Sequence, residues 1–181
     1  MNLFFLHSDP SICAQQHCDK HVVKMLLETT QILYTSFYIN NCIHLLPDFA
    51  YRKASPAHPT VIWVSLCISN WNYALHLAIN LSHEYTLRYK RVHSCDKHIN
   101  FLKNIVPDFP EKKNPYKPTT KLAYFPGTTP VPLAMPEDSM RSTAILSYRS
   151  YYMIHKKHFA KWNYSPIPLW FTSIDIRSFF V

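Results

Sequence analysis

The chain has 181 residues, of which 48% are hydrophobic and only 17% charged, so it can bury one sizeable core and needs no second domain. Nineteen basic against eleven acidic residues give a formal charge of +8, which favours a polyanionic partner such as nucleic acid, although many basic proteins have none. The single glycine, Gly127, excludes enzyme classes built on glycine-rich phosphate loops, dinucleotide-binding turns or nucleophile elbows.

The first predicted element is a short extended segment over residues 2–7, and a long helix follows it. Asp9 is suited to cap this helix and Pro10 to occupy its first turn. From about Ser11 to about Phe37 the sequence contains neither Gly nor Pro, so we expect one uninterrupted helix there.

Two further helical regions are predicted in the middle of the chain. Residues 40–58 carry Pro47 and Pro56 and form a loop. The stretch from Thr60 to about Arg91 is free of breakers and predicts either one long helix or two helices with a kink between them. Ser94 is suited to cap a shorter helix that runs to Val106.

The last third of the chain combines a proline-rich segment with one more helix. Seven prolines between 107 and 132 predict a long irregular loop that extends to about 136. A helix over 136–162 and an apolar, aromatic tail over 165–181 follow. The expected fold is therefore mostly α: a single domain over 1–181, with a bundle of two long and two shorter helices.

A narrow polar stripe is predicted along the first long helix. At about 100° per residue, its members fall within about 60° of one line; they are Cys13, His17, Lys20, His21, Lys24, Glu28, Gln31 and Thr35. Apolar residues cover the other sides of the helix, so this histidine-rich stripe is expected to face a groove and not bulk solvent.

The second long helical segment carries a similar but less regular stripe: Asn70, Tyr73, His76, Asn80, Glu84, Arg88 and Arg91. If the two stripes face each other across a cleft, acids, bases and phosphate-binding cations meet in one place, with His21 or Lys24 within hydrogen-bonding or one-water reach of His76, Glu84 or Arg88. The alternative is a set of buried ion pairs, such as Glu84 with Arg88, that only holds the helices together.

Residue spacing raises two other possibilities, a metal site and a base-stacking platform. Cys13, His17 and His21 lie at i, i+4 and i+8, and His93, Cys95 and His98 form a looser group, but neither matches a known zinc spacing, so no metal and no other cofactor is expected. Tyr148, Tyr152, His155 and Phe159, with Arg149 and Lys156 nearby, are expected to be core residues with a basic rim or, alternatively, a base-stacking platform.

The sequence also indicates where the protein is found. Its apolar runs are far shorter than the roughly 20 residues of a membrane helix, and the N-terminus lacks the features of a secretory signal. Five cysteines in no tight framework fit reduced thiols. We therefore expect a cytoplasmic protein with no membrane partner; the oligomeric state is left open.

Several ordered motifs resemble an uncharacterised family of large DNA phages and giant viruses. They are AQQHCDKHVVKMLLETTQIL, SPAHPTVIW, HEYTLRYKRVH, PLAMPED, SYRSYYMIHKKHFAKW and PLWF, and they cover most of the chain up to about residue 171. This resemblance implies a viral protein, present in the infected host cell, and brings no established activity.

A weaker resemblance, carried by CAQQH, by His58-Pro59 and by the aromatic C-terminal end, is to pyrimidine-dimer DNA glycosylases. Those are small basic helical enzymes that cut the glycosidic bond through an imine with the N-terminal amine. Here Asn2 is expected to leave Met1 in place, and Lys24 stands where those enzymes carry the catalytic Glu. The resemblance suggests that Lys24, if desolvated by its apolar flanks, is the imine-forming amine, with Glu28 or Glu84 as acid and base.

The leading hypothesis is a viral protein that acts on nucleic acid, DNA in the first place, as a glycosylase or lyase of the base-excision type. Its catalytic residues would be His17, His21, Lys24, Glu28 and Glu84. Its substrate and phosphate contacts would be Lys20, His76, Arg88, Arg91 and Arg149. The alternatives are a non-catalytic nucleic-acid or host-factor binding protein, and an enzyme acting on a small phosphorylated nucleoside or nucleotide.

Overall fold

The computed structural model describes residues 1–115 and 127–172, and these residues are mostly helical, with no strand among them. The mostly α prediction is therefore confirmed. The elements in chain order are α1 (Pro10–Gln16), α2 (Asp19–Ile39), the 3-10 turn η1 (Ile43–Leu45), α3 (Pro59–Val64), α4 (Ile68–Tyr89), α5 (Asp96–Leu102), the 3-10 turn η2 (Glu137–Ser139), α6 (Ala144–Tyr151), the π-helical turn η3 (Tyr152–Lys156) and α7 (Leu169–Thr172).

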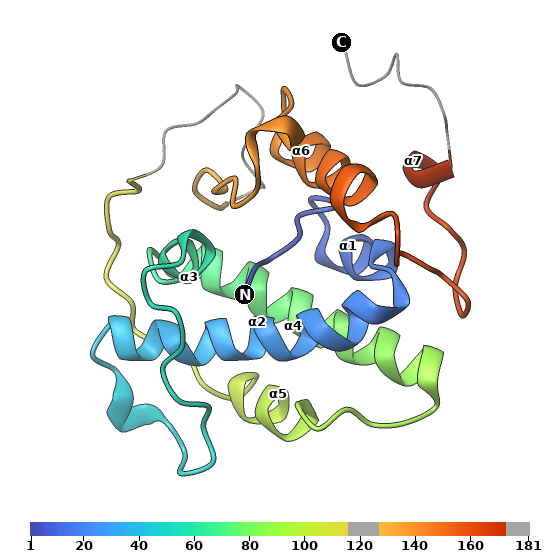
Figure 1. Ribbon diagram of the computed structural model, residues 1–181. Coiled ribbons are helices and arrows are strands. Elements are labelled where there is room, and N and C mark those ends of the chain that lie inside the picture. The colour runs from blue at the N-terminus through green and yellow to red at the C-terminus, as the bar shows by residue number, and fades with distance from the viewer. Residues whose placement is uncertain (116–126, 173–181) are drawn as a thin grey trace.

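The two long helices α2 and α4 pack against each other at the centre of the molecule, with α5 on one side and α6 on the other (Figure 1). Large side chains fill the space between them, among them Trp63, Trp71, Tyr34 and Phe37, each fully or almost fully buried. Burial of this much apolar surface is the main stabilising contribution to the fold. All five cysteines are free thiols and are buried.

The N-terminal segment runs between α2 and α6 before α1 begins (Figure 1). Its four consecutive apolar residues, Leu3 to Leu6, are 0 to 4% exposed. The ring of Phe4 lies 4.8 Å from that of His21 on α2 and stacks on Tyr151 of α6 at 5.6 Å. Because of this packing, the start of the chain is held against the polar side of α2.

The helix predicted over 11–37 is in fact two helices, because the backbone is extended at His17 and Cys18. No breaker residue stands at this position. The break is stabilised by Arg88 of α4, whose guanidinium donates hydrogen bonds to the carbonyl oxygens of Gln15 (2.9 Å) and His17 (2.8 Å). A cation that satisfies the last carbonyls of a helix favours its ending there.

A second break, between α3 and α4, was one of the two predicted alternatives. Ser65 ends α3, and its hydroxyl donates to the carbonyl of Val61 at 2.8 Å. The side-chain amide of Asn70 donates to the carbonyl of Trp63 at 2.7 Å. These side chains add to the backbone hydrogen bonds that the same two carbonyls accept from Ser65 and Leu66, and so strengthen the end of α3.

The helices in the C-terminal part are shorter than predicted. The third predicted helix is reduced to α5 and is preceded by Cys95, not Ser94. Residues Glu137–Ser139 form only a 3-10 turn, and α6 begins after Thr143, whose hydroxyl caps it by accepting the N–H of Leu146. Residues 116–126 of the predicted proline-rich loop and 173–181 of the predicted tail lie outside the described residues.

Candidate functional site

Four polar residues of the predicted first stripe follow one face of α2 and line two neighbouring pockets. The Glu28 pocket has a volume of about 250 Å³ and is lined by Met1, Asn2, Phe4, His21, Lys24, Met25, Glu28, His58, Ala134, Tyr151 and Lys156. The lysine groove, of about 370 Å³, is lined by Lys20, His21, Lys24, Lys156, His158 and Phe159. Because His21, Lys24 and Lys156 line both, the two form one continuous polar surface.

Glu28 is the centre of the first pocket, and its side chain is only 13% exposed. One carboxylate oxygen accepts the backbone N–H of Asn2 at 2.9 Å and lies 3.8 Å from the α-amine of Met1. The other oxygen lies 3.6 Å from Nζ of Lys24. Two amines thus share one shielded carboxylate, an arrangement that can exchange protons with either of them.

Lys24 itself is open to solvent, because two thirds of its side chain is exposed (66%). The apolar flanks of α2 therefore do not desolvate it, as the sequence suggested they would. The side chain of Met1, in contrast, is only 8% exposed, the residue as a whole is half-buried, and it is held in place by the packing of the segment that follows it. Of the two amines beside Glu28, that of Met1 therefore belongs to the more buried residue.

His21 is buried under the pocket and is held by Tyr152 at the end of α6. The Tyr152 hydroxyl is hydrogen-bonded to Nδ1 of His21 and accepts the backbone N–H of Cys18 at 3.3 Å. Burial, together with the neighbouring His17, Lys156 and Lys24, lowers the pKa of His21 to about 2. His21 is therefore neutral at physiological pH and lines both pockets as an uncharged hydrogen-bonding group.

His58 closes the other side of the Glu28 pocket from the start of α3. Its Nδ1 accepts the backbone N–H of Thr60 at 3.3 Å, so the neutral ring carries its proton on Nε2. Burial, followed by the positive charge of the α-amine, lowers the pKa of His58. Two uncharged imidazoles, His21 and His58, thus flank Glu28.

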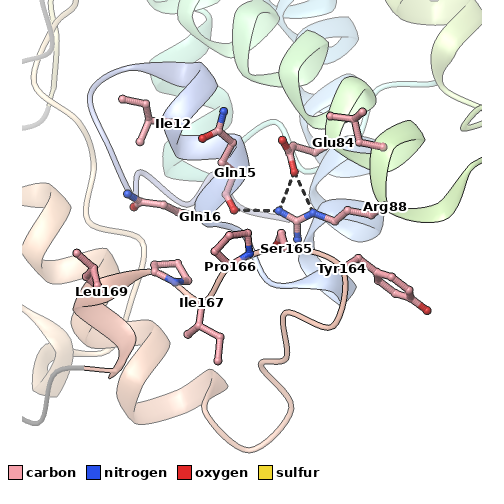
Figure 2. Close-up of a pocket in the computed structure, with 12 residues that line it drawn as sticks. Ile12, Gln15, Gln16, Glu84, Arg88, Tyr164, Ser165, Pro166, Ile167 and Leu169 are labelled. Atoms are coloured by element: carbon pink, nitrogen blue, oxygen red, sulfur yellow. Dashed lines mark hydrogen bonds and ion pairs between the residues drawn. The ribbon is translucent and has the colours of Figure 1, made fainter.

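The second stripe does not join this surface. Arg88 is almost fully buried, and its guanidinium binds Glu84 at 2.9 Å and Asp19 at 3.2 Å besides the two carbonyls at the end of α1. Figure 2 shows the contacts of Arg88 with Glu84 and Gln15 beside the segment that carries Tyr164 and Ser165. With its donors engaged by protein groups, Arg88 is not available to hold phosphate. This geometry matches the alternative in which Glu84 and Arg88 form a buried ion pair that holds the helices together.

The two polar stripes therefore do not face each other across a single cleft. Among the described residues, no hydrogen bond or ion pair joins His21 or Lys24 to His76, Glu84 or Arg88. The two stripes come together where Arg88 reaches the backbone of the α1–α2 break and where the side chain of Tyr73 is hydrogen-bonded to that of Cys13. The helical wheel failed here because it assumed one straight helix through residues 16–19.

The remaining candidate residues are scattered. His17 is fully buried, donates from Nδ1 to the carbonyl of Cys13 at 2.7 Å and lines neither pocket, and burial lowers its pKa to about 4. Arg149 donates to the carbonyl of Leu6 at 3.0 Å and lies over the ring of Trp170, so it ties the N-terminal segment to the C-terminal part. His76 and Arg91 are exposed, in other parts of the surface.

Some site residues were not identified as such from the sequence: the Met1 and Asn2 backbone, Tyr151, and Tyr152, whose hydroxyl holds the ring of His21. No pattern within α2 indicates them, because they come from the start of the chain and from α6. The spacing of aromatic and basic residues around Tyr152 and Lys156 could have pointed to this part of the site. It was interpreted as core residues with a basic rim or, alternatively, as a base-stacking platform.

Within 1–115 and 127–172, no group of three or more His, Cys, Asp or Glu side chains could hold a metal ion. None of the helices described is long and apolar enough to cross a membrane. No protein-family model, curated protein or solved structure matches the chain. The geometry of the two pockets is therefore the basis on which a function can be inferred.

Proposed function

We propose that this protein acts on DNA as a glycosylase or lyase of the base-excision type, with the Glu28 pocket as its active site. The observation that carries the proposal is the shielded carboxylate of Glu28, which lies within 4 Å of two amines, Met1 N at 3.8 Å and Lys24 Nζ at 3.6 Å. Amine nucleophiles with an adjacent acid–base group are the machinery of imine chemistry.

The reaction would use these groups in a defined order. The amine, freed of one proton by Glu28, attacks C1′ of the damaged nucleotide, and the glycosidic C–N bond breaks as the base leaves with the proton that the amine nitrogen gives up on bonding to C1′. Glu28 then returns its proton to the ring oxygen, the sugar opens, and an imine joins the amine to C1′. Removal of a C2′ proton from this imine expels the 3′-phosphate, which completes the lyase step.

The neighbouring lysine groove supports DNA as the substrate. It gathers Lys20, Lys24 and Lys156 beside the pocket, and the only carboxylate among the lining residues of both sites is that of Glu28. Cations placed next to a reacting nucleotide would hold its phosphates in register, and base contacts would come from the pocket itself. The overall charge of +8 acts in the same direction.

Borohydride trapping tests the proposal, because it reduces an imine to a stable covalent adduct. The protein is incubated with labelled duplexes that carry an abasic site or a pyrimidine dimer, and the adduct is located by peptide mapping. We expect an adduct on Met1 or on Lys24. Trapping by Glu28→Gln should fall by about a hundredfold or more, the range of general acid–base contributions.

The matched control is Glu111→Gln, the same substitution at an exposed site away from both pockets, which should trap like the parent. DNA binding without any adduct would reject the enzyme and leave a nucleic-acid binding protein. An adduct of equal yield in Glu28→Gln would reject the role of this pocket.

A further inference from the structure

An aromatic and basic surface lies at the C-terminal end of α4, beyond the proposed active site. Its cavity of about 490 Å³ is lined by Tyr85, Arg88, Tyr89, Lys90, Arg91 and Tyr164. The ring of Tyr89 lies 4.9 Å from that of Tyr85 and 5.3 Å from that of Tyr164. We call these three rings with Lys90 and Arg91 the tyrosine platform.

The rings of the platform are held in place, yet they remain accessible. The hydroxyl of Tyr89 donates to the carbonyl of Asp19 at 3.0 Å, which fixes the central ring against the start of α2. Tyr164 is 58% exposed, although aromatic rings usually bury most of their surface. A fixed and partly open set of aromatic faces is the arrangement on which nucleobases stack.

The charge at the platform is positive. Lys90 and Arg91 are both exposed, and Lys90 ends α4 in the left-handed conformation (φ 55°), a position usually occupied by Gly. The lining residues include no carboxylate, and the nearby Glu84 and Asp19 are already paired with Arg88. Two exposed cations beside three rings match the alternation of phosphate and base along a nucleic-acid strand.

The platform contacts the start of α2, where the lysine groove begins. The hydroxyl of Tyr89 donates to the carbonyl of Asp19, and Asp19 immediately precedes Lys20 of the groove. Along α2, the distance from Asp19 to Glu28 is about 14 Å at a rise of about 1.5 Å per residue. A strand that runs from the platform to the Glu28 pocket would therefore span roughly four phosphates at the about 3.4 Å spacing of stacked nucleotides.

We infer that the tyrosine platform binds an unpaired DNA strand that flanks the nucleotide in the Glu28 pocket, which makes DNA with a single-stranded region the preferred substrate. That the bound strand belongs to the substrate of the Glu28 pocket rests on the proposed function. Stacking distinguishes this from duplex binding, because the faces of paired bases are covered by their neighbours and only unpaired bases can lie on a tyrosine ring.

The test measures binding to undamaged oligonucleotides, so that catalysis plays no part. Three ligands of one sequence are compared: a single strand, a blunt duplex and a duplex with an unpaired tail that carries 2-aminopurine. We expect the single strand and the tailed duplex to bind about tenfold more tightly than the blunt duplex, with quenching of 2-aminopurine by stacking.

Variants then separate stacking from charge. Tyr164→Ala should remove the preference and the quenching, and Tyr164→Phe, which keeps the ring, should retain both. Arg91→Gln should weaken binding and reduce the salt dependence by about one phosphate contact, whereas Lys53→Gln, the control at an exposed site in the 46–58 loop, should change neither.

Equal binding of the three ligands, or a Tyr164→Ala protein that keeps the preference, would overturn the inference. Because damaged DNA is absent, these outcomes leave the trapping experiment untouched. Failure of trapping, in turn, leaves the binding preference measurable, so the two proposals fail separately.

Discussion

At the scale of single residues, the carboxylate of Glu28 lies between the amine of the half-buried Met1 and that of the exposed Lys24. Lys24 contributes a solvent-exposed ion pair, and such pairs stabilise proteins by about 0 to 1 kcal/mol. Met1 and the N–H of Asn2 contribute the shielded contacts. The stability of the pocket should therefore depend little on Lys24.

Replacement of Lys24 by Met tests this directly. We expect the free energy of unfolding, measured by urea titration, to change by less than about 1 kcal/mol, because the stem still packs and only an exposed pair is lost. A loss of about 3 kcal/mol or more would instead mean a buried structural network. If the variant still forms a borohydride adduct, the reacting amine is that of Met1.

Two of the buried histidines, His17 and His21, predict how stability depends on pH. The pKa of His21 is lowered to about 2 and that of His17 to about 4, from an ordinary value of 6.5. Below about pH 6.5 the unfolded chain binds protons that the folded chain does not. The stability is thus fully present above that pH and is lost as the pH falls, by up to about 1.4 kcal/mol per pH unit and histidine.

Urea titrations at pH 7 and pH 5 should show this loss, and His17→Gln should show a smaller one, because it removes one of the histidines that bind a proton more readily in the unfolded chain than in the folded one. His44→Gln is the control, since His44 is exposed. Equal stability of the parent at both pH values would contradict the burial of these imidazoles.

At the scale of elements, the arrangement of the site depends on the break between α1 and α2. The guanidinium of Arg88 joins three elements: the end of α1 through two carbonyls, the start of α2 through Asp19, and its own helix through Glu84. The break turns α2 so that its own stripe, from Lys20 to Glu28, faces the N-terminal segment and α6. Arg88 is thus a structural residue whose removal should disturb the whole site.

We expect Arg88→Met to reduce the free energy of unfolding by about 3 to 5 kcal/mol, because two carboxylates lose the cation that compensates their burial. Arg52→Met, at an exposed position, is the control and should change stability by less than about 0.5 kcal/mol. Thermal or urea unfolding measures both. A small effect in Arg88→Met would mean that water replaces the guanidinium and that the break does not depend on it.

At the scale of the whole molecule, the formal charge is +8, and the lysine groove and the tyrosine platform each present several of the basic side chains that produce it. If Lys20, Lys24, Lys156 and Arg91 each contact one phosphate, affinity for DNA should fall by roughly a hundredfold over a fourfold rise in salt. Fluorescence anisotropy of a labelled oligonucleotide across this range measures the slope. A flat dependence would reject phosphate contacts and favour a small-nucleotide substrate.

The sequence by itself determined the helical class and the polar character of α2. The absence of Gly and Pro over 60–91 and over most of 11–37 predicts helices because nothing local interrupts them, and the apolar flanks of α2 predict a buried helix with one open side. His21, Lys24 and Glu28 could be selected as one site because residues three and four apart share a face of a helix.

Only the tertiary structure decided where helices end and which groups meet. The break at His17 and Cys18 is stabilised by Arg88, a residue about 70 positions away, so no local pattern marks it. The amine of Met1 reaches Glu28 because Phe4 packs between α2 and α6, again a contact between distant segments. Local propensity acts over a few residues, whereas burial and long-range hydrogen bonds select among the conformations it allows.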